Sequence, residues 1–179
     1  MKNRLMYSFM LIPLLTGCDL LKDATEITIS TELNADIPVV VSTSMAKSAV
    51  EANAVTAIAF SKSQDLTLAS NADLEPYLSK IEEINLNSLL ITVNGLGEGQ
   101  TVNTFSLDVT GVGNIFMQTN ITMTNNTFTP EISAGILDQV ATKLFNDKQI
   151  TLTVSGTASG PMTFTAFLSF DSEVIAQVL

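Results

Sequence analysis

Both ends of the chain alternate between apolar and polar residues with a period of two, a pattern that an α-helix cannot place on one face. The odd positions from 27 to 41 are mostly apolar and the even ones mostly polar, and a similar alternation runs from 162 to 178. Successive strand side chains point to opposite faces, so each stretch predicts a long half-buried strand. The first could also be two strands that share a bend near Asn34, and a short helix over 173–179 is the alternative at the chain end. Pro38 falls on the polar parity, which indicates an edge strand.

Shorter alternating stretches lie between these two, and most end at Gly or Asn residues typical of turns. Their apolar members are Leu66 and Leu68; Leu89, Ile91 and Val93; Phe105, Leu107 and Val109; Ile115, Met117, Ile121 and Met123; and Ile150, Leu152 and Val154. Such strands predict a mainly β fold, an antiparallel β-sandwich of the immunoglobulin-like class. With 179 residues in all, we expect a single sandwich domain at 26–179.

Two stretches have helical spacing instead and predict short amphipathic helices across the sheet or at one end of it. The first has the stripe Leu74, Tyr77, Leu78 and Ile81, with Asn71 or Asp73 as its cap. The second is predicted to begin at Thr129-Pro130-Glu131. Its apolar face consists of Ile132, Ile136, Leu137, Val140, Ala141 and Leu144. The stretch from Ser42 to Asn53 has no clear period and is expected to be a loop.

Residues 1–17 have the layout of a secretory signal peptide. Lys2 and Arg4 precede an apolar stretch, Leu5 to Leu15, which is shorter than the roughly 20 residues of a membrane-spanning helix. The stretch leads into Leu15-Thr16-Gly17-Cys18. An ordinary cleaved signal peptide that happens to be followed by a Cys is the alternative interpretation.

These four residues resemble the lipobox of bacterial lipoproteins. The resemblance implies cleavage between Gly17 and Cys18, an S-linked diacylglycerol on Cys18 and N-acylation of its new amino group, for example with palmitate. Cys18 is the single Cys of the chain, so no internal disulfide competes for its thiol. Residues 18–25 would form the lipidated Cys and a short tether. We therefore expect a protein of the bacterial cell envelope that contacts the membrane through its acyl chains on the extracytoplasmic side. Both the inner and the outer membrane are compatible with these residues.

The remainder is also similar to uncharacterised β-sandwich lipoproteins of Bacteroidota. The resemblance rests on Phe60-Ser61-Lys62-Ser63, on Leu66-Thr67-Leu68 and on the stretch from Leu74 to Ile84. It implies a fold and an anchor, and no activity.

Charge and the absence of His exclude several classes of function. The chain has 8 basic against 18 acidic side chains, and loss of Lys2 and Arg4 with the signal peptide changes its net charge from −10 to −12. A chain without a basic cluster is not expected to bind nucleic acid or the headgroups of anionic lipids. With no His, His-based triads and His-ligated metal sites are excluded.

Few residues suggest chemistry. Ser44-Met45-Ala46-Lys47 matches the Ser-x-x-Lys pattern of penicillin-recognising enzymes but lacks its partner motifs and lies in an expected loop. Glu82 and Glu83 adjoin only in sequence and predict a solvated face. The glycine-rich stretch from Gly95 to Gly99 lies between strands, so a hairpin loop is expected rather than a phosphate cradle.

Oxygen ligands for Ca²⁺ are available, without EF-hand spacing. The candidates are Asp36, Asp147, Asp171, Ser172 and Glu173. Tyr77 is the one Tyr after the signal peptide, with no Trp in the chain, and its place on the apolar stripe indicates core rather than glycan stacking. We predict no catalytic residue, no metal site and no cofactor.

Some apolar residues fall on faces that the alternation predicts to be polar: Phe116, Phe167, Ile175 and Leu179. Either the helices cover them or they form an exposed patch that marks a partner site. The favoured function is a non-catalytic binding or assembly module of the envelope. A binding protein for a small apolar ligand held between helix and sheet is the alternative, and a hydrolase using carboxylates or Ser-Lys is a second one.

Overall fold

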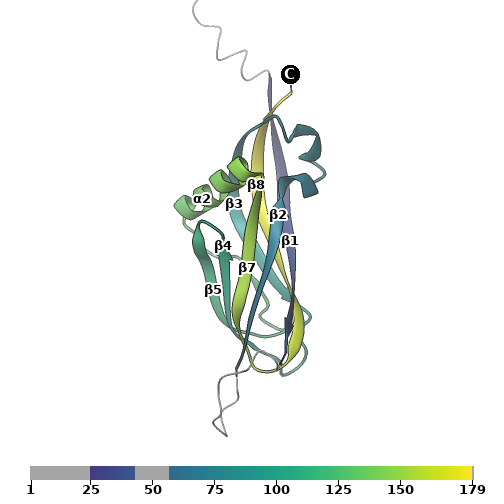
Figure 1. The fold of residues 1–179 in the computed structure, drawn as a ribbon, viewed down its shortest axis with the longest axis vertical. Coiled ribbons are helices and arrows are strands. Elements are labelled where there is room, and N and C mark those ends of the chain that lie inside the picture. The colour runs from purple at the N-terminus through teal and green to yellow at the C-terminus, as the bar shows by residue number, and fades with distance from the viewer. Residues whose placement is uncertain (1–24, 43–56, 179) are drawn as a thin grey trace, which may run out of the picture.

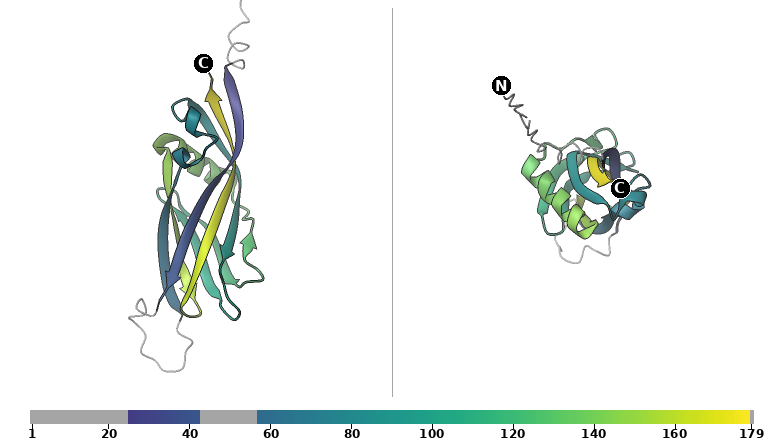
Figure 2. Two further views of the ribbon diagram at one scale, coloured as in Figure 1. Left: turned by 90° about the vertical axis from the view of Figure 1, so that its right-hand side faces the viewer. Right: turned by 90° about the horizontal axis from the view of Figure 1, so that it is seen from above.

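The protein is mainly β, with two antiparallel four-stranded sheets and one α-helix in the residues that the computed structural model describes, 25–42 and 57–178 (Figure 1). Sheet A has the order β1 (Glu26–Val41), β8 (Met162–Gln177), β3 (Ile81–Asn94) and β6 (Thr127–Phe128). Sheet B has the order β2 (Ile58–Thr67), β7 (Gln149–Ala158), β4 (Val102–Val109) and β5 (Gly113–Ile121). The strands run along the long axis of the molecule (Figures 1 and 2).

The two alternating ends of the sequence pair with each other. β1 and β8 form one continuous antiparallel ladder from Glu26–Gln177 to Val41–Met162. Both long strands are therefore confirmed, without a break near Asn34 or a terminal helix up to Gln177. β1 is an edge strand that pairs with β8, and Pro38 is exposed on it, as its parity predicted.

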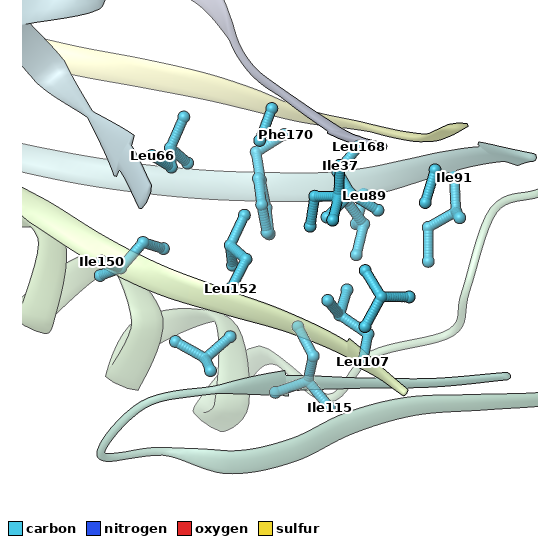
Figure 3. Close-up of a cluster of buried hydrophobic side chains, with 14 of the residues drawn as sticks. Ile37, Leu66, Leu89, Ile91, Leu107, Ile115, Ile150, Leu152, Leu168 and Phe170 are labelled. Carbon is cyan, nitrogen blue, oxygen red and sulfur yellow. The ribbon is translucent and has the colours of Figure 1, made fainter. Parts of the chain in front are cut away.

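The core lies between the sheets, where the apolar parities of the strands meet (Figure 3). Phe60 of β2 and Phe164 of β8 contact edge to face across the two sheets, with ring centroids 5.3 Å apart. Ile37, Leu89, Leu152 and other side chains from both sheets are completely buried. Burial of such apolar surface is the main force that holds the two sheets together.

The strand order does not confirm the immunoglobulin-like class. In that class the first two strands of the chain lie in the same sheet. Here β1 belongs to sheet A and β2 to sheet B, and among the strands of the described residues only β4 and β5 follow each other within one sheet. The coarser prediction, an antiparallel sandwich, fits the two facing sheets.

The second predicted helix is confirmed as α2 (Ala134–Asp147), but its start was wrong. Ser133 is the N-cap, so Pro130 and Glu131 lie before the helix rather than in its first turn. α2 packs against β3 of sheet A and β7 of sheet B. It therefore closes one side of the sandwich with its buried face, which consists of Leu137, Val140, Ala141 and Leu144.

The first predicted helix is wrong. The stretch between β2 and β3 contains two single 3₁₀ turns, η2 (Leu68–Ser70) and η3 (Glu75–Tyr77), and Ile81 already pairs in β3. The Asn71 carboxamide oxygen accepts hydrogen bonds from the backbone N–H groups of Asp73 and Leu74. Asn71 thus closes a local turn, which competes with helix formation.

The prediction of a hairpin loop from Gly95 to Gly99 is also wrong. β3 ends at Asn94 as predicted, but the next strand, β4, belongs to the other sheet. Gly95 and Gly99 have φ angles of +95° and +74°, which favour glycine, and Leu96 between them is buried. The glycine-rich stretch therefore crosses from one sheet to the other.

Candidate functional site

The outer face of sheet A is defined by the side chains that point away from the core. The ladders place Asp36, Phe167 and Thr92 in one cross-strand row, and Asn34, Ser169 and Leu90 in the next. Other outward positions on β1 are Glu32, Pro38 and Val40. This face combines apolar side chains with carboxylates.

Four apolar residues run diagonally across this face from β3 to the edge strand β1: Leu90, Phe167, Pro38 and Val40. We call these four residues the apolar diagonal. Val40 is 64% exposed and Leu90 39% exposed, while Phe167 is half-buried. Diagonal neighbours on a sheet lie about 7–8 Å apart, within reach of an aromatic ring. The four side chains thus form one mostly open apolar surface.

Exposed carboxylates share the face, among them Glu32, Asp36, Glu83, Asp171 and Glu173. Glu32 and Asp171 stand directly opposite each other in the β1–β8 ladder, where like charges are destabilising. Asn87 Nδ2 donates to Asp171 at 3.3 Å, and no strand of sheet A carries a Lys or Arg within the described residues. Lys80 directly precedes β3, at the end of the sheet where Glu26 pairs with Gln177. The carboxylates are left without a cation from their own sheet.

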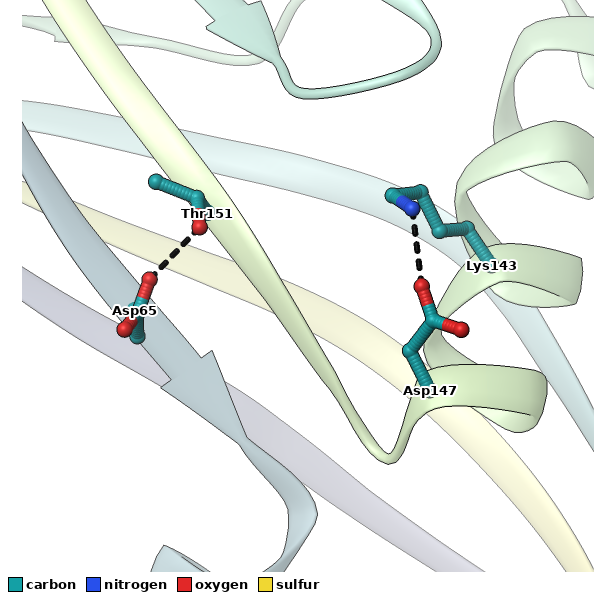
Figure 4. A network of polar contacts seen from close by, with 4 residues as sticks. All are labelled: Asp65, Lys143, Asp147 and Thr151. Carbon is teal, nitrogen blue, oxygen red and sulfur yellow. Dashed lines mark hydrogen bonds and ion pairs between the residues drawn. The ribbon is translucent and has the colours of Figure 1, made fainter.

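The outer face of sheet B is built differently. Its strands present Ser and Thr hydroxyls that bond one another across the ladders, as in Thr104–Thr157 at 2.9 Å and Ser63–Thr153 at 2.8 Å. Thr151 donates to the Asp65 carboxylate at 2.6 Å (Figure 4). Met117 is an apolar side chain on this face, 65% exposed.

Two open grooves flank α2. One of about 410 Å³ lies between the helix and the Gly111-Val112 turn, and one of about 260 Å³ lies between the helix and residues 82–85 of β3. Both grooves expose apolar as well as polar surface, and Asp138 and Thr142 line both. At the helix end Lys143 pairs with Asp147 at 2.8 Å (Figure 4). The groove at residues 82–85 lies between helix and sheet, where the alternative apolar ligand was expected, and Ile84, Ala141 and Phe145 contribute apolar side chains to it.

The residues considered as candidates for catalysis or Ca²⁺ binding do not converge in the described part of the chain. Glu82 and Glu83 are exposed at a register irregularity of β3 rather than on a helix. Ser172 points into the core and donates to the Thr31 carbonyl oxygen at 2.7 Å, away from its neighbours Asp171 and Glu173. Over 25–42 and 57–178, no three His, Cys, Asp or Glu side chains are arranged to hold a metal ion.

Several predicted residues lie outside the described part of the chain. These are the signal peptide, the lipobox with Cys18, the Ser44–Lys47 motif and Leu179. In the part that is described, no helix has the length and hydropathy needed to cross a membrane.

The apolar residues on unexpected parities have two different surroundings. Phe116 is half-buried against the rings of Phe105 and Phe128, at 6.4 and 6.1 Å between centroids, and not beneath a helix. Phe167 and Ile175 are half-buried on the outer face of sheet A. Sequence reasoning missed Val40 and Leu90, although their even parity next to buried odd positions was a usable signal.

Comparisons with known proteins add a weak structural likeness. No protein-family model matches the chain, and no curated protein matches it. A solved structure of Desmodium yellow mottle tymovirus is similar, with 14% identity over 96% of this chain and 97% of that chain, at a TM-score of 0.35. A likeness at this level supports no inference about function.

Proposed function

We propose that the protein is a lipid-anchored, non-catalytic binding or assembly module on the extracytoplasmic side of the bacterial cell envelope. The observation that carries the binding role is the apolar diagonal on a sheet face that also carries exposed carboxylates. Contiguous exposed apolar surface rimmed by polar residues is typical of protein interaction sites. The lipobox residues Leu15 to Cys18 carry the anchoring role.

The position of the tether supports this role. The described chain begins at Thr25, seven residues after Cys18, and β1 starts at Glu26. A tether of this length reaches at most about 25 Å. The sandwich would therefore stand close to the bilayer, with the apolar diagonal nearer the end of the molecule remote from Glu26 (Figure 1).

For the finer fold class, we infer an eight-stranded jelly roll rather than an immunoglobulin-like sandwich. Six of the seven connections between successive strands cross from one sheet to the other. An arrangement of two facing four-stranded sheets with crossing connections is expected for the two interlocked Greek keys of a jelly roll.

Metabolic labelling with a clickable fatty acid tests the anchor. We expect Cys18→Ala to abolish incorporation and to release the protein from membranes, while Ser44→Ala retains both properties. Two or three acyl chains anchor a protein stably, since each buried CH₂ contributes about 0.8 kcal/mol. A Cys18→Ala protein that still carries the labelled lipid would refute the anchor.

A further inference from the structure

The apolar diagonal cannot be covered without also covering carboxylates. Asp36 stands directly opposite Phe167 in the β1–β8 ladder, and Glu32 and Asp171 follow two rows further along the same strands. All three carboxylates are exposed. A surface that removed water from them without supplying a cation would bear a desolvation cost that opposes binding.

From this arrangement, and resting on the proposed function, we propose that the outer face of sheet A docks a protein whose apolar contact surface is bordered by Lys or Arg side chains. The apolar part would cover Leu90, Phe167, Pro38 and Val40. The basic border would face Glu32, Asp36 and Asp171. Charge complementarity of this kind selects partners and speeds their association more than it adds affinity.

A second copy of the chain is a poor occupant of the face. A two-fold interface places the same patch on both sides. Each copy would bring the same carboxylates, and no described lysine belongs to a strand of sheet A. Lys62 lies on β2, Lys143 and Lys148 lie on and after α2, and Lys80 precedes β3 at the Glu26 end, remote from the apolar diagonal. The bilayer is a poor occupant as well, because anionic lipid repels an acidic face.

Site-specific photocrosslinking in native cell envelopes tests the proposal on the full-length protein. The photoreactive residue benzoylphenylalanine replaces Val40 or Leu90 on sheet A, and Met117 on sheet B as the matched control. Val40 and Met117 are equally exposed, at 64% and 65%. Thermal melts of each variant establish that it folds, and Leu90 duplicates the test at a second position.

The charge requirement is tested in the same assay. One variant combines Glu32→Gln, Asp36→Asn and Asp171→Asn, and its control combines Asp65→Asn and Asp108→Asn on sheet B. Since each exposed ion pair contributes little and three are removed together, we expect adduct yield at Val40 to fall about fivefold in the first variant and to hold in the control. Raising the salt concentration from about 0.05 to about 0.5 M should lower the adduct yield at Val40 in the protein with the unmodified charge pattern by a similar factor.

Three results can be distinguished. Adducts at Val40 and Leu90, about tenfold above Met117, that fall on neutralisation and map to partner sites with Lys or Arg would support the proposal, because rim charges govern such encounters. Position-specific adducts that ignore salt and neutralisation, or that join two copies of this chain, would overturn the partner chemistry and leave the assembly role standing. Equal yields at all three positions, or none, would overturn both.

Discussion

The two outer faces of the sandwich follow the same alternation but differ in the surroundings of their charged and apolar side chains. On sheet B, hydroxyls bond one another across the ladders, and Asp65 and Asp108 each accept a hydrogen bond from a hydroxyl. On sheet A, Glu32 faces Asp171, and the apolar diagonal lies open. A face that only had to meet water would be expected to resemble sheet B. The difference teaches where the two faces should diverge in stability: the like charges of Glu32 and Asp171 are expected to cost sheet A local stability, which the proposed docking role would explain.

The largest effect is expected where sheet B depends on close backbone packing. A Cβ on Gly156 would lie 1.9 Å from the Thr104 carbonyl oxygen, whereas a Cβ on Gly160 meets nothing within 4 Å. Gly156→Ala should therefore destabilise the protein by roughly 3 kcal/mol or more, since backbone must move, and Gly160→Ala by less than about 1 kcal/mol. Urea unfolding of both variants measures the contrast. Similar midpoints would show that β4 and β7 can separate at little cost.

The second largest loss of stability is expected when a hydroxyl pair of sheet B is broken. Thr157→Val keeps the shape of the side chain but removes its hydrogen bond to Thr104, which should cost about 0.5–1 kcal/mol. A double-mutant cycle that adds Thr104→Val and the double variant measures the coupling free energy between the two residues. Zero coupling energy in chemical denaturation would mean that water replaces this bond without loss.

On sheet A, in contrast, removal of a like charge should raise the stability of the protein. Glu32→Gln removes the like charge that faces Asp171 and should stabilise the isolated domain by about 0.2–1 kcal/mol at low salt. The gain should shrink at high salt, because screening already weakens the repulsion. Chemical denaturation of the wild type and of Glu32→Gln at two ionic strengths measures this gain in stability and its dependence on salt. A loss of stability at low salt would contradict the view that this face is electrostatically strained.

The smallest change in stability is expected on α2, which belongs to neither outer sheet face. Lys143 and Asp147 form an exposed i,i+4 pair at 2.8 Å. Asp147→Asn should destabilise the protein by about 0.3–0.5 kcal/mol, the usual size for such pairs. Since the change removes a carboxylate, it controls for a general benefit of lowering the negative charge. If it stabilised as much as Glu32→Gln, overall charge rather than the cross-strand pair would explain the gain.

The sequence predicted those parts of the fold that depend on local alternation. β1, β8 and α2 follow from apolar periods of two and 3.6, because burial of one face determines each element. β2 was predicted only around Leu66, since Lys62 and Gln64 interrupt its core-facing parity and remain exposed. The 3₁₀ turns before β3 were mistaken for a helix because the side-chain hydrogen bonds of Asn71 do not appear in a hydropathy pattern.

The candidate site was predictable only in part. Parity alone identified Phe167 as an apolar residue on a polar face. It could not place Asp36 beside Phe167 or Glu32 opposite Asp171, because those pairs join residues that are more than a hundred positions apart in the chain. Which strands share a sheet is equally non-local, and the same limitation explains why the sequence predicted an immunoglobulin-like class that the strand order does not confirm.

Hydroxyl-radical footprinting tests the central claim most directly, because it reports whether sheet A is covered in the cell envelope. Oxidation of Leu90 and Phe167 is compared with that of Met117 in intact envelopes and in the purified protein. We expect oxidation of the two sheet A residues to fall several-fold in envelopes while Met117 stays unchanged, as covering an interface excludes water from it. Equal oxidation in both samples at all three residues would contradict a docking role for sheet A.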